Sequence, residues 1–467
     1  MRAGIVDQRL WQTLVVIQRD ELVQAFRARG YQLWVVGGAL RDELRGVTTN
    51  DVDYATDATP DEVEGLVRGL GTTPSTVGKR FGTIGILVEE ADAEQWSEIT
   101  TFRGDAYSEG SRWPEVQFGR EIHGDLARRD FTINAMARDA LTGALLDPFD
   151  GAHDLEAEII RTVGEPAERF REDPLRILRG LRFASQLGFE VDERTIDGMR
   201  ETASLLGTLS QERITAELDK LLCGRDPGSG LRGLEATNCL EVVLPEVATM
   251  VGCEQNSFHR FDVWGHTVAT VEAIETTPES LRIRRWAALL HDLGKPAIRH
   301  RKANGEWGFY RHETVGAELA ERLLERLRMN RAEARLIALL VRRHMDRPDP
   351  ADPRSVRRFM AKVPGHWPDL LALKSADNGS HTYVDDAYHD ALTAACERAE
   401  RDEADKLHAE SPLTGDDLVA LFDREPGPWI RAIKEHLSSM VLDGELAPGD
   451  KPAAERAAKS MLRRPRR

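Results

Sequence analysis

The sequence has no long hydrophobic run. Its 467 residues include no stretch near the roughly 20 consecutive apolar residues that a membrane-spanning helix requires. Charged residues from Asp7 to Glu21 interrupt the amino-terminal segment, so it does not resemble the apolar segment of a signal peptide. These absences predict a cytoplasmic protein with no membrane partner.

Cysteine is also scarce. The four cysteines, Cys223, Cys239, Cys253 and Cys396, are far apart and form no Cys-x-x-Cys pair. A zinc knuckle requires closely spaced pairs, and a disulfide framework in a small secreted domain requires regularly spaced cysteines. We therefore expect reduced, buried thiols that pack as small apolar side chains.

Basic residues are outnumbered by acidic ones. The chain has 63 lysines and arginines against 79 aspartates and glutamates, which gives a net charge of -16. Non-specific coating of nucleic acid requires many cations facing the phosphates, so this balance argues against it. Local arginine clusters, at 161–182 and 463–467, leave RNA binding open, although the terminal cluster can equally be a solvated tail.

Two kinds of pattern divide the chain. Short β-rich runs alternate with helical patterns between residues 32 and 147, and helical patterns follow from about residue 150 nearly to the end. This order predicts an α+β fold, with a mixed head followed by an all-α body. The glycine-rich run at 224–233 predicts a turn at a boundary within that body.

The first candidate site is a pair of glycines between a predicted strand and a predicted helix, in the run Val35-Val36-Gly37-Gly38-Ala39-Leu40-Arg41-Asp42. Glycine lets backbone N–H groups approach a phosphate, and the amino terminus of a helix favours negative charge. Because such turns are often purely structural, this motif alone does not decide the function.

Two carboxylates follow a short loop later. In a strand over Asp51-Val52-Asp53-Tyr54, Asp51 and Asp53 point to the same face and repel each other unless a cation lies between them. Mg²⁺ is the expected cation, because it prefers carboxylate oxygens together with substrate phosphates. Glu98, in another strand-like run, is the candidate third carboxylate of a two-metal site. The alternatives are a solvated acidic strand and an ordinary exposed glutamate.

Four ordered motifs together resemble the class II tRNA nucleotidyltransferase and bacterial poly(A) polymerase family. They are Gly37-Gly38-x-x-Arg41-Asp42, Asp51-x-Asp53, Arg128-Arg129-Asp130-Phe131-Thr132-Ile133-Asn134-Ala135 and Glu172-Asp173-Pro174-Leu175-Arg176. The resemblance covers about residues 30–240 and implies a polymerase-β-like head with a base-holding neck. It places Arg128 and Arg129 near the triphosphate and ribose. It also places Asp130 near a sugar hydroxyl, with Asn134 as support.

The fourth motif has a physical interpretation of its own. Asp173 before Pro174 predicts a helix start, and Arg176 lies three residues on, along the same helix face. One acceptor beside one forked donor matches the amino and ring-nitrogen edges of cytosine and adenine, and leaves uracil or guanine with unpaired polar groups. A helix cap with a salt bridge is the alternative. The neck residues Glu212 and Arg213 are assigned structural support.

One further motif bears on the branch of the family. The run Gly78-Lys79-Arg80-Phe81-Gly82-Thr83 resembles the CCA-adding branch, whereas bacterial poly(A) polymerases usually carry a bulkier residue in place of the second glycine. The segment Tyr107-Ser108-Glu109-Gly110-Ser111-Arg112-Trp113-Pro114 looks full-length, which favours completion through the final A. Activity limited to A or CC addition stays open.

A second constellation lies in the helical body. His266, His291, Asp292, His312, His344 and Asp377 follow one another in H…HD…H…H…D order. Imidazoles and carboxylates from several helices can hold a divalent metal that activates water for phosphoester hydrolysis. This order resembles the HD phosphohydrolase superfamily, and the alternative is an HD fold that is purely structural.

The expected organisation is a nucleotidyltransferase head at 1–150, a base-selecting and RNA-binding neck at 151–245, an HD domain at 246–395 and a C-terminal helical segment with a basic tail at 396–467. The expected function is addition of CMP and AMP from CTP and ATP to the tRNA 3′ end, with Mg²⁺ at the head and an unidentified divalent metal at the HD site. A partial CC- or A-adding enzyme, a poly(A) polymerase and a chain that is primarily an HD phosphohydrolase are the alternatives. The sequence leaves the oligomeric state open.

Overall fold

The computed structural model describes residues 16–47, 52–90, 93–104, 117–255, 261–274, 278–379, 384–407, 411–442, 445–447 and 449–463. The chain forms two compact units, Met1–His344 with Ala376–Val384, and Met345–Ser375 with Asp385–Arg467. Both predicted sites belong to the first unit. No helix in the described part of the chain is long and apolar enough to span a bilayer.

A seven-stranded mixed sheet forms the head, in the order β1-β4-β5-β3-β2-β8-β9. The strands are β1 (Ile17–Gln18), β2 (Leu33–Val36), β3 (Val52–Thr56), β4 (Thr83–Glu90), β5 (Ala93–Thr101), β8 (Ala137–Asp139) and β9 (Leu145–Leu146). Strand β3 runs parallel to β5 and antiparallel to β2. The sheet confirms the predicted mixed head.

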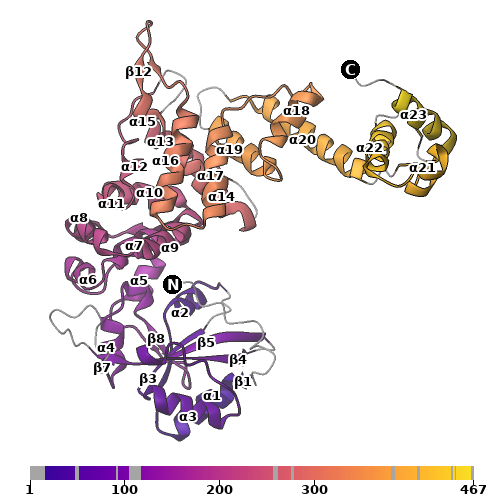
Figure 1. Ribbon diagram of the computed structural model, residues 1–467. Helices are drawn as coiled ribbons and strands as arrows, with labels where there is room; N and C mark the ends of the chain where they lie inside the picture. The colour runs from indigo at the N-terminus through magenta and orange to yellow at the C-terminus, as the bar shows by residue number, and fades with distance from the viewer. Residues whose placement is uncertain are drawn as a thin grey trace. The chain divides into compact units, whose positions relative to one another are not determined.

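Alternation along the strands gives the sheet two different faces. Helices α1 (Arg19–Ala28) and α3 (Pro60–Gly69) pack on one face, where Val35 and Tyr54 join their apolar side chains (Figure 1). Helix α4 (Ile122–Ala127) packs on the other, against Val36 and Ala55. Because Asp53 is two residues from Ala55 in strand β3, its side chain lies on the α4 face.

Shorter elements complete the head and lead into the neck. They are α2 (Gly38–Leu44), η2 (Lys79–Phe81), β6 (Arg103–Gly104), β7 (Gln117–Phe118), η3 (Thr132–Asn134), α5 (Gly151–Glu156), β10 (Ile159–Ile160) and β11 (Glu190–Val191). The neck helices are α6 (Pro166–Glu172), α7 (Leu175–Leu187), α8 (Glu193–Thr202), η4 (Ala203–Thr208), α9 (Gln211–Leu222), α10 (Pro227–Ala236), α11 (Cys239–Val243) and α12 (Pro245–Ala248).

Helix α10 corrects one prediction. The glycine-rich run at 224–233 was expected to form a turn, but most of it is helical. A Cβ on Gly230 would lie 2.7 Å from Leu221 Cγ, and one on Gly233 would lie 2.7 Å from Leu181 Cδ2. These glycines therefore allow α10 to pack closely on α9 and α7.

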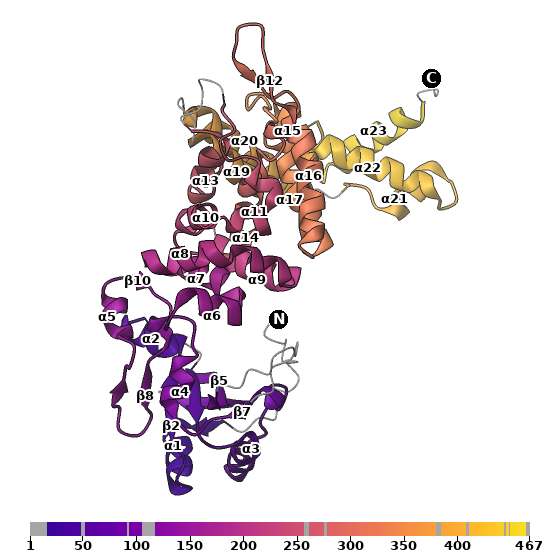
Figure 2. The ribbon, with the colours of Figure 1, turned by 90° about the vertical axis from the view of Figure 1, so that its left-hand side faces the viewer.

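The helices of the body follow the neck along the chain (Figure 2). Those of the first unit are α13 (Val263–Glu272), α14 (Pro278–Leu290), α15 (Lys295–Ile298), α16 (His312–Arg326) and α17 (Arg331–Arg343), with the hairpin β12 (His300–Arg301) and β13 (Trp307–Gly308). The second unit contains α18 (Pro353–Ala361), α20 (Asp386–Leu407), α21 (Gly415–Phe422), α22 (Pro428–Leu442) and α23 (Lys451–Arg463). Helix α19 (Trp367–Gly379) begins in the second unit and ends in the first.

The cysteines have the expected character. Cys239, Cys253 and Cys396 are buried, Cys223 is half-buried, and all four are free thiols. Burial raises the pKa of Cys239 to about 11. The Cys239 thiol is therefore protonated at neutral pH.

Candidate functional site

A pocket of about 610 Å³ lies where the head meets the neck. Its lining contains every predicted nucleotide contact, which are Gly37, Gly38, Arg41, Arg128, Arg129, Asp130, Asn134, Asp173 and Arg176. Asp53, Leu175, Arg179, Arg182, Phe183 and Arg213 complete it. Seven arginines against three aspartates make the pocket suited to an anionic ligand.

Gly37 shapes the turn between β2 and α2. Its φ of 76° is in the region that side chains disfavour, and a Cβ there would lie 3.3 Å from Arg129 Nη1. The same Cβ would lie 3.8 Å from Asp53 Oδ2. Glycine at this position therefore lets the turn approach both the arginine and the carboxylate.

The predicted carboxylates are only partly described. Asp53 in β3 is the direct partner of Glu98 in β5, so both exposed side chains lie on the same face of the sheet. Glu98 is not among the pocket-lining residues. Asp51 and the segment Tyr107–Pro114 lie outside the described residues. The structure therefore gives the positions of two of the three predicted carboxylates, Asp53 and Glu98.

A chain of hydrogen bonds connects α2 to α7 across the pocket. Arg41 Nη1 donates to Asn134 Oδ1 at 2.9 Å, and Asn134 Nδ2 donates to Asp130 Oδ1 at 3.1 Å. Arg179 Nε then donates to Asp130 Oδ2 at 2.7 Å. Burial raises the pKa of Asp130, but Arg179 and these hydrogen bonds more than offset it and hold the pKa below its ordinary value. Asp130 is therefore a fixed, charged acceptor.

Asp125 orients the two arginines of the third motif. Arg128 Nη2 lies 2.8 Å from Asp125 Oδ1, and Arg129 Nη2 lies 3.2 Å from Asp125 Oδ2. Burial raises the pKa of Asp125, yet the two guanidiniums lower it overall. The buried carboxylate thus holds both cations at the pocket wall.

The neck motif forms two separate contacts. Asp173 Oδ1 accepts a hydrogen bond from Leu175 N at 3.2 Å at the start of α7, as the predicted helix start requires. Both carboxylate oxygens also lie 3.3 Å from Arg213 Nη2. Arg176 Nη1 instead donates to Glu172 Oε2 at 2.7 Å, and its Nη2 to Arg128 O at 2.7 Å. Arg213, to which the sequence assigned structural support, contacts Asp173 and also lines the pocket.

Sequence reasoning missed Arg179, Arg182 and Phe183. The guanidiniums of Arg41, Arg179 and Arg182 lie 5.2, 5.5 and 4.2 Å from the Phe183 ring centroid. Arg182 Nη1 also lies 3.0 Å from Glu217 Oε2, and burial lowers the pKa of Arg182 to about 10, so it stays charged at neutral pH. Helical spacing from Arg176 through Arg179 to Phe183 is the signal that could have found them.

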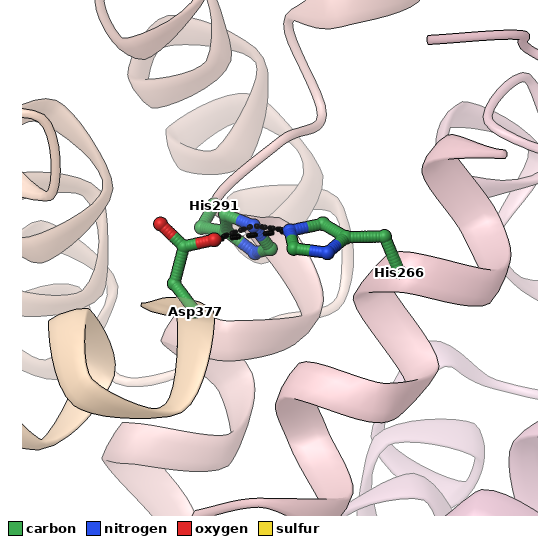
Figure 3. A group of neighbouring side chains, drawn as sticks. All are labelled: His266, His291 and Asp377. Carbon is green, nitrogen blue, oxygen red and sulfur yellow. Dashed lines mark hydrogen bonds and ion pairs between the residues drawn. The ribbon is translucent and has the colours of Figure 1, made fainter. Parts of the chain in front are cut away.

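The second site brings together all six predicted metal ligands. His266, His291 and Asp377 form one group (Figure 3). Asp292, His312 and His344 form another, and the ligand atoms of each group lie within 4.8 Å of one another. His266 Nε2 lies 3.0 Å from Asp377 Oδ1, and His312 Nε2 lies 3.2 Å from His344 Nε2.

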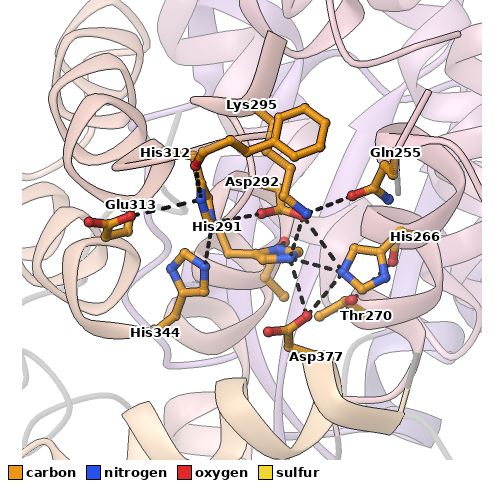
Figure 4. Close-up of polar contacts among 12 residues, drawn as sticks. Gln255, His266, Thr270, His291, Asp292, Lys295, His312, Glu313, His344 and Asp377 are labelled. Atoms are coloured by element: carbon orange, nitrogen blue, oxygen red, sulfur yellow. Dashed lines mark hydrogen bonds and ion pairs between the residues drawn. The ribbon is translucent and has the colours of Figure 1, made fainter. Parts of the chain in front are cut away.

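Asp292 connects the two groups (Figure 4). Its Oδ2 lies 3.2 Å from His291 Nε2, and its Oδ1 lies 3.3 Å from His312 Nε2. Lys295 Nζ lies 2.6 Å from Asp292 Oδ2 and 2.6 Å from Gln255 Oε1. Two oxygens of one carboxylate therefore face different histidine groups.

Backbone carbonyls orient three of the histidines. The Nδ1 atoms of His291, His312 and His344 lie 2.7, 3.0 and 2.6 Å from the carbonyl oxygens three residues earlier. Donation through Nδ1 directs Nε2 of each ring toward the cluster, as is usual for metal-binding histidines. Burial and His312 lower the pKa of His344 to about 3, so this imidazole is neutral. Despite burial, His291 and Lys295 hold the pKa of Asp292 well below its ordinary value.

Comparisons with known proteins agree with this arrangement. The family described as poly A polymerase head domain matches residues 33–161, the probable RNA and SrmB-binding site of polymerase A matches 188–250, and the HD domain matches 259–424. A CCA-adding enzyme of Enterococcus faecalis is 31% identical over 91% of this chain and 91% of its own length. The chain belongs to the tRNA nucleotidyltransferase family.

Members of this family with different products are similar to the chain. An A-adding tRNA nucleotidyltransferase of Deinococcus radiodurans is 34% identical over 88% of this chain and 92% of its own length. The structure of the Bacillus stearothermophilus CCA-adding enzyme in complex with CTP shares the fold, with a TM-score of 0.62 at 24% identity over 95% of this chain and 97% of the other. The expected domain limits at 150, 245 and 395 stay predictions.

Proposed function

We propose that the chain adds CMP and AMP from CTP and ATP to the 3′ end of tRNA. The observation that carries this proposal is the single pocket in which nine predicted nucleotide contacts lie beside Asp53. The family relatives include enzymes named for CCA addition and for A addition. Arginine guanidiniums at the wall suit a triphosphate, because they present fixed donors to phosphate oxygens.

Asp53 and Glu98 fit a magnesium site. Both are exposed carboxylates on the same face of adjacent strands, and Mg²⁺ prefers such oxygens. Asp51, Asp53 and Glu98 would hold a pair of magnesium ions. When bound, these ions supply Lewis-acid activation of the RNA 3′-hydroxyl and neutralise the leaving pyrophosphate. The hydroxyl oxygen bonds to the α-phosphorus while the bond to pyrophosphate breaks, and the hydroxyl proton passes to solvent. Arg128 and Arg129, held by Asp125, orient the triphosphate for this displacement.

Asp173, Arg176 and Arg213 carry the proposed choice of base. Asp173 presents a carboxylate held by Arg213, while Arg176 is anchored by Glu172 and lines the same pocket. A fixed acceptor beside a fixed donor pairs with the amino and ring-nitrogen edge of cytosine or adenine. Without a base pair to a template, these side chains do the selecting.

This proposal predicts that Asp173→Ala, Arg176→Ala and Arg213→Ala each relax discrimination between CTP or ATP and UTP or GTP. The discrimination should fall by about 10-fold or more, since unpaired polar groups no longer penalise the wrong base. Single-nucleotide addition assays measure it, and Arg200→Ala, on the exposed surface of α8, is the control. Unchanged discrimination in all three variants would mean that the neck does not read the base.

The turn at 78–83 supports the CCA-adding branch. Gly82 has a φ of 88°, a conformation that is strained for the bulkier residue usual in poly(A) polymerases. The test is to incubate the protein with tRNAs ending before CCA or after CC, and with an RNA that is not a tRNA, and to sequence the products. Addition of C, C and A to the first substrate supports a complete CCA-adding enzyme, growth only after CC supports an A-adding enzyme, and a homopolymer on the last substrate supports a poly(A) polymerase.

A second activity is supported by the buried histidine cluster. Six ligand-type side chains in two groups, with Asp292 in contact with a histidine of each, would hold divalent metal. When bound, such ions supply a nucleophilic hydroxide for phosphoester hydrolysis. Metal analysis of the purified protein, together with hydrolysis of 2′,3′-cyclic and terminal phosphates under several metals, tests this activity. If the protein neither binds a metal nor hydrolyses these phosphates, the HD domain is a structural module only.

A further inference from the structure

The β12–β13 hairpin carries a local excess of positive charge on an acidic protein. Between Arg299 and Arg311 there are four arginines and lysines and one glutamate, in a chain with net charge -16. His300, Arg301, Lys302 and Arg311 are exposed. The hairpin extends away from α15 and α16 in both ribbon views. Its cations therefore face solvent and are accessible to a ligand.

Trp307 gives this charged surface a defined shape. The guanidiniums of Arg299 and Arg301 lie 3.8 and 4.0 Å from its ring centroid. Trp307 Nε1 donates to Glu254 Oε2 at 3.1 Å, and Arg301 Nη1 donates to Gly305 O at 2.7 Å. The two cations are thus positioned by stacking and hydrogen bonding before any ligand binds.

The base of the hairpin is connected to the metal-ligand cluster. Phe309 O accepts from Nδ1 of the ligand His312 at 3.0 Å, and the Phe309 ring centroid lies 5.5 Å from Lys295 Nζ. Lys295 in turn contacts Asp292. Tyr310, between Phe309 and the ligand helix α16, is 82% exposed. Phe309 and Lys295 therefore link the base of the hairpin to the ligands His312 and Asp292.

We propose that this hairpin binds the single-stranded 3′ end of an RNA and directs its terminal phosphate to the HD cluster. Exposed aromatic rings stack on bases without regard to sequence, and cations alongside them pair with the backbone. The inference rests on the proposed HD hydrolysis and names its substrate class.

The reaction balances without a further reactant. Water oxygen bonds to the terminal phosphorus, the bond from phosphorus to the ribose 3′ oxygen breaks, and a proton passes to that oxygen. The product is a 3′-hydroxyl and inorganic phosphate. That hydroxyl is the group that the head needs for nucleotide addition, so a phosphate-blocked end would become extendable.

The test uses the full chain and a neutralised hairpin, Arg301→Gln with Lys302→Gln. The control is Arg322→Gln with Arg335→Gln, which removes two exposed cations from α16 and α17. The probe is a 3′-phosphorylated oligouridine of about twelve nucleotides, compared with uridine 3′-monophosphate. Hydrolysis is measured with each divalent metal, and oligonucleotide binding is measured by fluorescence anisotropy at several salt concentrations.

We expect the hairpin variant to lower kcat/KM for the oligonucleotide about tenfold. The slope of the logarithm of the binding constant against the logarithm of salt concentration should decrease in magnitude by about 1.4, because two phosphate contacts are lost. The mononucleotide rate and the control variant should stay unchanged. Tyr310→Ala should also weaken oligonucleotide binding, through lost stacking and with no change in salt slope.

The outcomes separate the two proposals. Equal oligonucleotide hydrolysis and equal salt slopes in wild type and hairpin variant would overturn the hairpin inference and leave HD hydrolysis standing. If the wild type hydrolyses neither substrate with any metal, the HD activity is refuted, and the salt slopes alone decide whether the hairpin binds RNA.

Discussion

Single side chains in the head pocket are held before any ligand arrives. Asp125 fixes Arg128 and Arg129, and Asp130 fixes Arg179 and Asn134. Such preorganisation matters for phosphoryl transfer, because donors already in place need not reorganise as charge develops. The arrangement of the pocket therefore depends on two buried aspartates, Asp125 and Asp130.

Asp53 is the described residue on which nucleotide addition should depend most. We expect Asp53→Ala to lower the addition rate by roughly 10³-fold, since the metal pair loses a ligand that stabilises transition-state charge. The fold should survive, because Asp53 is exposed and its removal relieves repulsion. Primer extension and thermal unfolding measure the two effects, with Glu94→Ala, an exposed carboxylate of β5, as control. Substantial addition by the variant with magnesium present would refute the assignment.

The pair of Asp130 with Arg179 should give a pH-dependent contribution to stability. Because the pKa of Asp130 is lowered in the folded state, its contribution is present above the unfolded value of about 3.9 and is lost as the pH falls through the folded pKa. In Arg179→Leu, burial without the cation raises that pKa. The variant should lose up to about 3 kcal/mol at neutral pH, and less below about pH 4.

Urea unfolding of wild type and Arg179→Leu, at neutral pH and below about pH 4, measures the difference in the free energy of unfolding. The control is Arg194→Leu, whose partner Glu165 is more than half exposed, so that little stability depends on the pair. A difference between wild type and Arg179→Leu that is the same at both pH values would show that Asp130 is not the titrating group.

Glycines allow some helices of this protein to pack closely, and the sequence pattern alone did not predict these close contacts. The run at 224–233 reads as a turn but lies largely in α10, where glycine allows neighbouring helices to approach. Gly294 has the same role in the HD domain, because a Cβ there would lie 2.2 Å from the backbone oxygen of His312. Helix α16 carries His312, so this contact determines where a metal ligand lies.

Gly294→Ala should therefore displace α16 and weaken metal binding at the HD cluster by about tenfold or more, as misplacing a ligand does. Nucleotide addition should be unchanged, because the head pocket is built from other elements. Metal content and calorimetric titration measure the loss. The control is Gly379→Ala, where a Cβ meets nothing within 4 Å. Full metal affinity in Gly294→Ala would show that α16 does not need this close approach.

At the scale of the whole molecule, the chain combines two candidate chemistries that share no residue. The head pocket is lined by residues 37–213, whereas the ligand cluster begins at His266. Neck helix α9 connects them structurally, because Trp286 Nε1 of α14 donates to Asp219 Oδ1 at 2.7 Å and Thr215 Oγ1 donates to Leu327 O at 2.6 Å. The activities should be separable even though the helices are packed together.

We expect His291→Ala with Asp292→Ala to eliminate metal-dependent hydrolysis of cyclic or terminal phosphates while CMP or AMP addition survives. The double change removes one ligand from each group, so neither group remains complete. Parallel addition and hydrolysis assays check this, with thermal unfolding to confirm that the body remains folded. Loss of addition in a folded variant would show that the two sites are coupled.

Residue types and their spacing along the chain predicted the kind of chemistry at each site. Gly37, Asp53 and the motif at 128–134 carry local signals of phosphate and metal chemistry, and short β-rich runs predicted strands in the head. The order of histidines and aspartates likewise indicated a metal cluster. These signals are local, because they depend on residue type and on the period of a strand or helix.

The packing of the folded chain, in contrast, determines which side chains meet. Arg213 is distant in sequence from Asp173 yet contacts it, and Phe183 is surrounded by guanidiniums from α2 and α7. The two oxygens of Asp292 face different histidine groups because α14, α16 and α17 converge there. Contacts between residues far apart in the chain follow from how helices and sheet pack, and no local pattern of residues encodes that packing.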